Sequence, residues 1–337
     1  MNLPRLVCVL ALALLFSLPD AALAQRRRQR AVAPPPPAVA QHVAILDGAS
    51  GALLACEQCE EPVPPASMAK LMTVLIVLEQ LQAGEITMET RFPVSEYAWR
   101  EHGAMSSGSH MFLALNSTPS VRDLLRGAVI VSANDACVVL AEGIAGSEQA
   151  FVALMNRRAQ ELGLRSARFR NATGVDDPEQ RISTADLGRL ARHLIVTYPE
   201  FYRTYSEREF TYNNRTQQNR NPLLGAFQGA DGVKTGHTDD SGYGLVGSAM
   251  LNGERRIIVF NGLPTMAARA SEAQRLMRAA FYDYSVTRLA AAGDVVGEAR
   301  VRLGGRRAVP LVAQSDIVVG GTRAVQQGLS AHIVYTG

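Results

Sequence analysis

Charge is scarce in this chain, and the main part of the sequence has no excess of one sign. Charged residues make up 19% of the 337 positions and apolar residues 47%, which favours a substantial core and excludes global disorder. The formal net charge is +3, but four positive charges lie in one short run, at Arg26, Arg27, Arg28 and Arg30. Subtracting these four leaves −1 for the rest of the chain, which excludes a basic face for nucleic acid.

Cysteine is also scarce, and the sequence lacks the ligand spacing of a metal site. Cys56 and Cys59 have the spacing of a redox motif or of half a zinc site, but no second ligand pair completes a tetrahedral site. The six histidines are scattered, without an HExxH motif. We therefore expect no metal and no other cofactor. Cys56 and Cys59 either form a disulfide in an oxidising compartment or remain surface thiols in a turn.

The apolar run at the N-terminus is too short for a permanent membrane span. It covers eleven residues, Leu6 to Phe16, whereas a spanning helix needs about 20. Arg5 precedes the run and Ala22-Leu23-Ala24 follows it, which is the pattern of a signal peptide over residues 1–24. An uncleaved anchor is the alternative. Residues 25–40 are rich in arginine and proline and are typical of a stiff, solvated linker.

The remaining length suits one large domain followed by a small one. Alternating apolar residues predict a β-hairpin over residues 42–54, and the Pro-rich turn after it leads into a helix over 66–84. Further helices are expected at 121–145, broken at 132–134, and at 148–163, 184–197 and 267–284; strands are expected at 209–212, 232–235, 243–250 and 256–261. This order predicts an α/β protein of the α+β type, in which helices flank an antiparallel sheet. Residues 286–337 are expected to form a small all-β module, which is either a minimal one or an incomplete one.

Ser67 and Lys70 stand three residues apart at the start of the apolar helix over 66–84. At that spacing their Cβ atoms lie about 5–6 Å apart on one helix face. A serine hydroxyl is a weak nucleophile until a base takes its proton, and desolvation lowers the pKa of a buried lysine enough for it to be that base. The spacing alone also fits an N-cap serine followed by a surface lysine.

Two further motifs strengthen the catalytic interpretation. Ser132-Ala133-Asn134 lies at the break between two apolar helices, where a hydroxyl and an amide can face a cleft. Lys234-Thr235-Gly236 lies on a predicted strand, with a glycine where the backbone must approach another group closely. An SxxK, S-x-N and K-T-G set in this order is known from penicillin-binding proteins and class A β-lactamases.

The resemblance extends beyond these three motifs. The stretches PPASMAKLMT, SSGSHMFL, SANDACVVLAE, FRNATGVDDP, NRNPLL and DGVKTGHTDDSGYGLVGSA resemble the D-alanyl-D-alanine carboxypeptidases, which are low-molecular-mass penicillin-binding proteins of serine peptidase family S11. The similarity covers residues 41–285, which we take as the catalytic domain, and continues weakly into a partial C-terminal β domain over 286–337. It implies the β-lactamase/transpeptidase-like fold, a peptidoglycan stem peptide as substrate, β-lactam antibiotics as inhibitors, and a location in the periplasm or on the outer face of the cytoplasmic membrane.

The resemblance also implies roles for individual residues. Ser67 would be the acylated nucleophile, Lys70 its base, and Ser132 the group that relays a proton to the leaving D-alanine. The substrate would be bound by Asn134 and by the strand residues Lys234, Thr235, Gly236 and His237. Backbone N–H groups of Ser67 and of a residue near His237 would form the oxyanion hole. Ala133 replaces the glycine that is commonest in the family, and no loss of activity is expected from it. The family usually has a longer C-terminal β domain followed by an amphipathic helix that attaches to the membrane; this sequence leaves membrane attachment open.

A carboxypeptidase must also bind the free carboxylate of its substrate, for which an arginine is suited. The two candidates in similar stretches are Arg220 and Arg269. We expect Arg220 to make a structural salt bridge, and Arg269 to serve the carboxylate, directly or by holding Thr235.

Three other functions compete with this one. A class A β-lactamase needs a glutamate for deacylation, and the stretch LRSARFRNATG (164–174) has none. A DD-endopeptidase that cleaves peptide cross-links differs only in substrate. A non-catalytic peptidoglycan-binding protein has no need of a desolvated lysine. Cys137, close to Asn134 in sequence, either faces the cleft or is a small apolar core residue.

Overall fold

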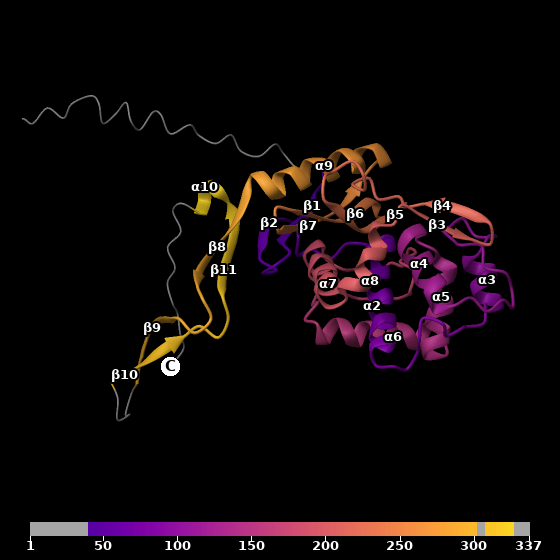
Figure 1. The fold of residues 1–337 in the computed structure, drawn as a ribbon, viewed down its shortest axis with the longest axis horizontal. Coiled ribbons are helices and arrows are strands. Elements are labelled where there is room, and N and C mark those ends of the chain that lie inside the picture. The colour runs from indigo at the N-terminus through magenta and orange to yellow at the C-terminus, as the bar shows by residue number, and fades with distance from the viewer. Residues whose placement is uncertain (1–39, 302–306, 327–337) are drawn as a thin grey trace, which may run out of the picture. The chain divides into compact units, whose positions relative to one another are not determined.

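The computed structural model describes residues 40–301 and 307–326 (Figure 1). The predicted signal peptide and nearly all of the predicted linker lie outside these residues. Five antiparallel strands form the central sheet in the order β2-β1-β7-β6-β5. Their bounds are Leu53–Glu57 for β2, His42–Asp47 for β1, Glu254–Leu263 for β7, Gly242–Leu251 for β6 and Ala230–Thr238 for β5. The predicted fold class is confirmed.

The strands are apolar on both faces because helices cover both faces of the sheet. Along β1, Ala44 and Leu46 pack into one core with helices that include α2 and α7, whereas Val43 and Ile45 pack into a second core with α9. Successive strand residues point to opposite faces, so this alternation places β1 between two layers. In Figure 1, α9 and α7 lie on opposite sides of the sheet.

The first helical layer follows the hairpin β1-β2. It consists of the 3₁₀ turn η1 (Ala66–Ala69), α2 (Lys70–Gln82), α3 (Glu96–His102), α4 (Val121–Arg126), the π-helical turn η2 (Gly127–Val131), α5 (Asn134–Ala145), α6 (Glu148–Glu161), α7 (Thr184–Thr197), α8 (Pro199–Tyr202) and the 3₁₀ turn η3 (Arg203–Ser206). The helices predicted near 66–84, 148–163 and 184–197 are confirmed within a few residues. The sequence analysis missed α3 and the short α8.

The remaining elements are mostly strands. A two-stranded ribbon, β3 (Glu209–Tyr212) with β4 (Arg215–Gln218), precedes β5, and α9 (Met266–Tyr282) follows β7. The C-terminal part contains β8 (Tyr284–Ala290), β9 (Val295–Arg300), β10 (Ala308–Val312), β11 (Ile317–Thr322) and α10 (Arg323–Gln326). Within the described residues these strands form two separate pairs, β8 with β11 and β9 with β10.

The structure answers the question that the sequence left open about Cys56 and Cys59. Cys56 and Cys59 form a disulfide, which decides between the two readings left open by the sequence. Cys59 is fully buried, and its carbonyl accepts hydrogen bonds from the Ala185 N–H and the Thr184 hydroxyl at the start of α7. Among the described helices, none alone has the length and hydropathy to cross a bilayer; α5 and α6 meet these criteria only together, with a bend of 85° between them.

Candidate active site

Ser67 and Lys70 lie at the junction of η1 and α2, facing each other. The Lys70 Nζ donates to Ser67 Oγ at 2.9 Å, to Asn134 Oδ1 at 2.7 Å and to the Thr173 carbonyl at 2.5 Å. An ammonium group has three N–H donors, so these three acceptors saturate it. The amine is thereby fixed within reach of the Ser67 hydroxyl.

Lys70 is buried, as the apolar run after it predicts. Its side chain is only 1% exposed, and this burial lowers its pKa to about 8, with a smaller contribution from the nearby charge of Arg220. Removing a cation from water disfavours its charged form, which is the physical cause of the shift. Lys70 therefore changes between its charged and neutral forms near pH 8, so the neutral amine becomes available slightly above neutral pH.

Ser132 and Asn134 reach the same place from the break between helices. The π-helical turn η2 ends at Ser132, which has a left-handed backbone with φ of 66° and breaks the helical direction before α5 begins. Asn134 is the first residue of α5, and its N–H donates to the Ser109 carbonyl at 2.7 Å. Asp135 is fully buried and accepts hydrogen bonds from the N–H groups of Met111 and Leu113, so it holds the adjacent loop in place.

Strand β5 forms the opposite wall of the site. The Lys234 Nζ donates to Ser132 Oγ and to the Thr235 carbonyl, both at 3.0 Å. Complete burial, followed by the charge of Lys70, lowers the pKa of Lys234 well below its usual value. A Cβ at Gly236 would lie 2.9 Å from the Pro65 carbonyl oxygen and 3.1 Å from Met68 Cγ. Glycine at this position therefore lets the strand approach the nucleophile turn.

Arg269 is a buried cation without an acidic partner in the described part of the chain. It lies in the first turns of α9, is 3% exposed, and its Nε has no hydrogen-bond partner there. Its guanidinium lies 5.4 Å from the centre of the Tyr243 ring, and Tyr243 in turn stacks on His237 with ring centres 3.8 Å apart. Burial lowers the pKa of Arg269, so an anion in the cleft would be favourably bound beside it.

The prediction that Arg220 makes a structural salt bridge is wrong. Arg220 donates to the Ser109 hydroxyl at 2.9 Å and to the Val131 carbonyl at 3.3 Å, and no acidic residue among the described ones pairs with it. Both acceptors are neutral groups: a hydroxyl in the loop whose carbonyl accepts from the Asn134 N–H, and the last carbonyl of η2. Arg220 thus links this loop to the end of η2 and adds positive charge to the cleft wall.

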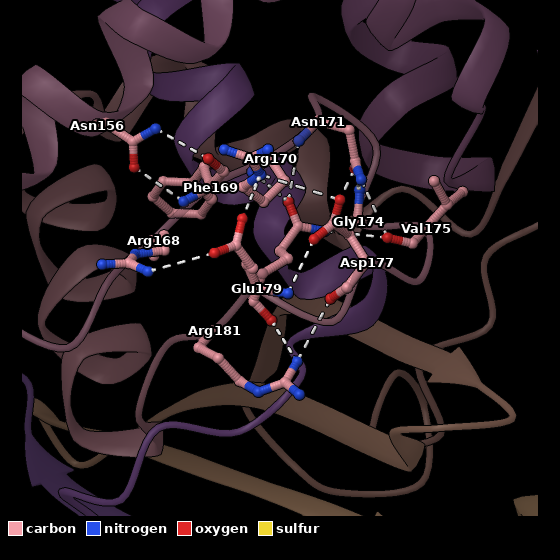
Figure 2. A network of polar contacts seen from close by, with 11 residues as sticks. Asn156, Arg168, Phe169, Arg170, Asn171, Gly174, Val175, Asp177, Glu179 and Arg181 are labelled. Atoms are coloured by element: carbon pink, nitrogen blue, oxygen red, sulfur yellow. Dashed lines mark hydrogen bonds and ion pairs between the residues drawn. The ribbon is translucent and has the colours of Figure 1, made fainter.

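The sequence analysis missed a loop that completes the site. This loop lies in the stretch FRNATGVDDP, which supplies the Thr173 carbonyl to Lys70. Figure 2 shows the polar network inside this loop. Asn171 Oδ1 accepts from the N–H groups of Thr173 and Gly174, while Asn156 exchanges two hydrogen bonds with the Phe169 backbone, both at 2.8 Å. Side chains replace a regular element here, which explains why no periodicity indicated the loop.

All the predicted site residues except Lys70 and Lys234 line one cleft of about 780 Å³, and those two lysines lie buried beneath it. The cleft is also lined by residues that the sequence analysis did not assign, among them Tyr97, Glu101, His102, Val175 and Asp176.

Cys137 is fully buried in the core and has a free thiol, so the core interpretation is correct for it. In the described part of the chain, no three or more His, Cys, Asp or Glu residues are grouped as metal ligands would be.

The chain is similar to known proteins in both sequence and structure. A family model described as D-alanyl-D-alanine carboxypeptidase, peptidase S11, matches residues 28–264. The chain is 39% identical over 279 residues to D-alanyl-D-alanine carboxypeptidase DacA of Haemophilus influenzae, covering 82% of this chain and 70% of that protein. Penicillin binding protein 5 of Haemophilus influenzae is similar in structure with a TM-score of 0.76 and 38% identity, covering 87% of this chain and 86% of the other. The ampicillin-bound form of penicillin-binding protein D2 of Listeria monocytogenes gives a TM-score of 0.64 at 31% identity, covering 74% and 99%.

Proposed function

The chain belongs to the S11 family of serine peptidases, the D-alanyl-D-alanine carboxypeptidases, and from this premise we propose that it removes the terminal D-alanine of peptidoglycan stem pentapeptides through an acyl-enzyme on Ser67. The observation that carries this proposal is the contact between Ser67 Oγ and a Lys70 amine whose pKa is about 8. A nucleophile beside a desolvated base is the arrangement that acyl transfer needs.

The neighbours of Lys70 dictate how a neutral amine must orient. It has two N–H groups and one lone pair, while Asn134 Oδ1 and the Thr173 carbonyl are acceptors only. These two acceptors take the two N–H groups, so the lone pair faces the third neighbour, the Ser67 hydroxyl. Ser67 then donates its proton to Lys70 as its Oγ bonds to the carbonyl carbon of the penultimate D-alanine.

The second half of the reaction needs a proton on the leaving amine. Ser132 contacts Lys234 and lines the cleft. As the C–N bond breaks, its hydroxyl gives its proton to the D-alanine nitrogen and is reprotonated with the proton that Lys70 took from Ser67, which returns Lys70 to the neutral amine. Water afterwards hydrolyses the ester on Ser67 and releases the shortened peptide. The Lys234 amine donates to Ser132 and to the Thr235 carbonyl, whereas the Lys70 amine contacts Ser67, which favours Lys70 as the base for the nucleophile.

The substrate carboxylate would bind at the Arg269 end of the cleft. Arg269 has no counter-ion among the described residues, and Thr235 offers a hydroxyl nearby in the same cleft. A bound carboxylate would also favour the charged form of Lys234, whose pKa burial lowers. An unpaired buried guanidinium is costly in a protein that has no anion to bind, which supports a substrate with a free terminal carboxylate.

The decisive experiment compares a peptide ending in D-Ala-D-Ala with the same peptide carrying a terminal amide. A charge-assisted contact contributes about 1.5–3 kcal/mol, so the free acid should be cleaved about 10- to 150-fold faster in kcat/KM. Arg269→Ala should remove most of this preference. Equal cleavage of both peptides by the wild type would contradict the carboxypeptidase assignment and favour a DD-endopeptidase.

β-Lactams and the location of the enzyme complete the proposal. A related enzyme has been crystallised in an ampicillin-bound form, and the shared motifs support β-lactams as acylating inhibitors of this chain. The N-terminal pattern supports export to the periplasm or to the outer face of the cytoplasmic membrane, where peptidoglycan is accessible.

A further inference from the structure

A chain of contacts leads from the catalytic lysine to a carboxylate outside the cleft. The Thr173 carbonyl accepts from Lys70, and the preceding carbonyl, that of Ala172, accepts from the Thr73 hydroxyl at 2.7 Å. Thr73 lies one turn after Lys70 on α2, so two side chains of one helix face hold two consecutive carbonyls of the loop. Ala172, Thr173 and Thr73 are all fully buried.

Glu148 holds the other side of the same peptide segment. Its Oε1 accepts from the Ala172 N–H at 2.9 Å, and its Oε2 accepts from the Tyr97 hydroxyl at 3.1 Å. Glu148 lies in the first turn of α6, which Ser147 caps by accepting from the Ala150 N–H. The carboxylate is therefore fixed at both oxygens and mounted on a capped helix.

Tyr97 connects this carboxylate to the wall of the cleft. Its hydroxyl lies 3.3 Å from His102 Nε2, and the two rings meet edge to face with centres 5.3 Å apart. Burial, together with the charge of Glu148, raises the pKa of Tyr97 to about 12, so the hydroxyl remains a donor at neutral pH. Tyr97 and His102 line the cleft, whereas Glu148 lines a separate cavity of about 460 Å³ on the far side of Tyr97.

We propose that Glu148 is a positioning residue for acyl transfer, which fixes the Thr173 carbonyl and through it directs the Lys70 lone pair at Ser67. This inference rests on the proposed function, because it assumes that neutral Lys70 takes the Ser67 proton. Without the Ala172 N–H contact, the Thr173 carbonyl has more freedom, and the amine can turn its lone pair away from Ser67. The loss is then one of orientation, and misplacement of a catalytic group by about 1 Å can cost on the order of 100-fold in rate.

Three substitutions separate geometry from charge. Glu148→Ala removes both contacts, and Glu148→Asp keeps the charge but is too short to reach both partners. Glu148→Gln keeps the length: its oxygen can accept from Ala172 and its amide can donate to the Tyr97 oxygen. The matched control is Gln149→Ala, in the same helical turn, where the side chain is exposed.

The measurements are kcat and KM for a D-Ala-D-Ala peptide and the penicillin acylation rate between pH 6 and 10, with thermal unfolding of each variant. We expect Glu148→Ala and Glu148→Asp to lower kcat and the acylation plateau by about 10- to 100-fold, with KM changed less than about twofold. Glu148→Gln should restore at least about half of the wild-type rate, and Gln149→Ala should match the wild type. In the Glu148 variants, the midpoint of the acylation rate against pH should not lie above that of the wild type.

Several results would overturn the proposal. An upward shift of the pH midpoint in Glu148→Ala would mean that water had reached Lys70 through a loosened loop, which is a merely structural effect. A Glu148→Gln variant that unfolds at the wild-type temperature but is as slow as Glu148→Ala would exclude the geometric role. If Glu148→Ala acylates normally while Ser67→Ala takes up no penicillin, the positioning role fails and the proposed function stands.

Discussion

At the scale of single residues, the site depends on two lysines whose pKa values are lowered by burial. Lys70 and Lys234 are 1% and 3% exposed, and neither has an ion-pair partner among the described residues. The charge of Lys70 also lowers the pKa of Lys234, and the charge of Arg220 lowers the pKa of both lysines. Burial disfavours the ammonium form of Lys70 and so lowers its pKa. The lowered pKa is what allows the amine to act as a base near neutral pH.

The Lys70 base has a definite pH signature. Because only the neutral amine accepts the Ser67 proton and the Lys70 pKa is about 8, penicillin acylation should rise from pH 6 to 9 with a midpoint near that value. Lys70→Arg should nearly abolish acylation, since a guanidinium keeps its proton, and the loss should exceed that from Ser132→Ala. Intact mass after timed exposure to penicillin measures both effects. A flat profile, or near-normal acylation of Lys70→Arg, would contradict this mechanism.

At the scale of elements, the site exists because β5, η1 and the loop that contains Thr173 approach one another closely. Gly236 in β5 meets the Pro65 carbonyl, and a Cβ at Gly174 would lie 2.0 Å from the Ala66 carbonyl oxygen. Gly174 also has φ of 83°, which other residues adopt at a cost. These two glycines bring backbone from distant parts of the chain against the nucleophile turn.

Gly236→Ala tests this approach. The added methyl group lies under 3.0 Å from the Pro65 oxygen, so β5 must move away from Ser67, and acylation should fall by at least about 10-fold while the fold is retained. Gly321→Ala in β11 is the matched control, because its Cβ would meet no atom within 4 Å. Acylation rates and unfolding temperatures of the two variants provide the comparison. Normal acylation by Gly236→Ala would show that the close approach is not needed.

The loop over residues 164–174 carries a prediction about the fate of the acyl-enzyme. It places a backbone carbonyl at Lys70 and contains no glutamate that would activate a deacylating water. The penicilloyl ester on Ser67 should therefore hydrolyse over minutes or longer, and Ser67→Ala should take up no penicillin. The decay of the mass adduct after removal of free penicillin measures the rate. Rapid steady-state turnover of penicillin would instead favour a β-lactamase.

Local patterns in the sequence predicted the helices and strands well, but they did not predict the contacts between these elements. The three motifs were placed correctly on a helix start, a helix break and a strand, because each has its own local signal of periodicity or interruption. The role of Thr173 was missed because the group that accepts from Lys70 is a backbone carbonyl, which any residue possesses. Arg220 was misjudged for a related reason: its acceptors, Ser109 and Val131, are neutral groups far away in sequence. Glu148 and Tyr97, 51 residues apart, lacked any shared local pattern.

At the scale of the whole molecule, the cysteines bear on the proposed export of the chain. The disulfide joins Cys56 in β2 to Cys59 just after the strand, and the Cys59 carbonyl accepts hydrogen bonds from the start of α7. Disulfides persist in oxidising compartments, which agrees with the proposed location outside the cytoplasm. Cys137 is protected by a different means, since it is completely buried and its pKa is raised to about 11 by that burial.

This combination predicts the alkylation pattern of the exported enzyme. Cleavage after Ala24 removes Cys8 and leaves three of the four cysteines, and the buried Cys137 thiol should resist iodoacetamide in the native protein. Denaturation without a reductant should allow one alkylation, at Cys137, and reduction should raise the number to three. Intact mass after export counts the adducts and locates the new N-terminus in the same experiment. A chain that retains residues 1–24 would argue for the uncleaved anchor, and three alkylations without reductant would argue against an oxidising compartment, because only a reduced Cys56–Cys59 pair can react.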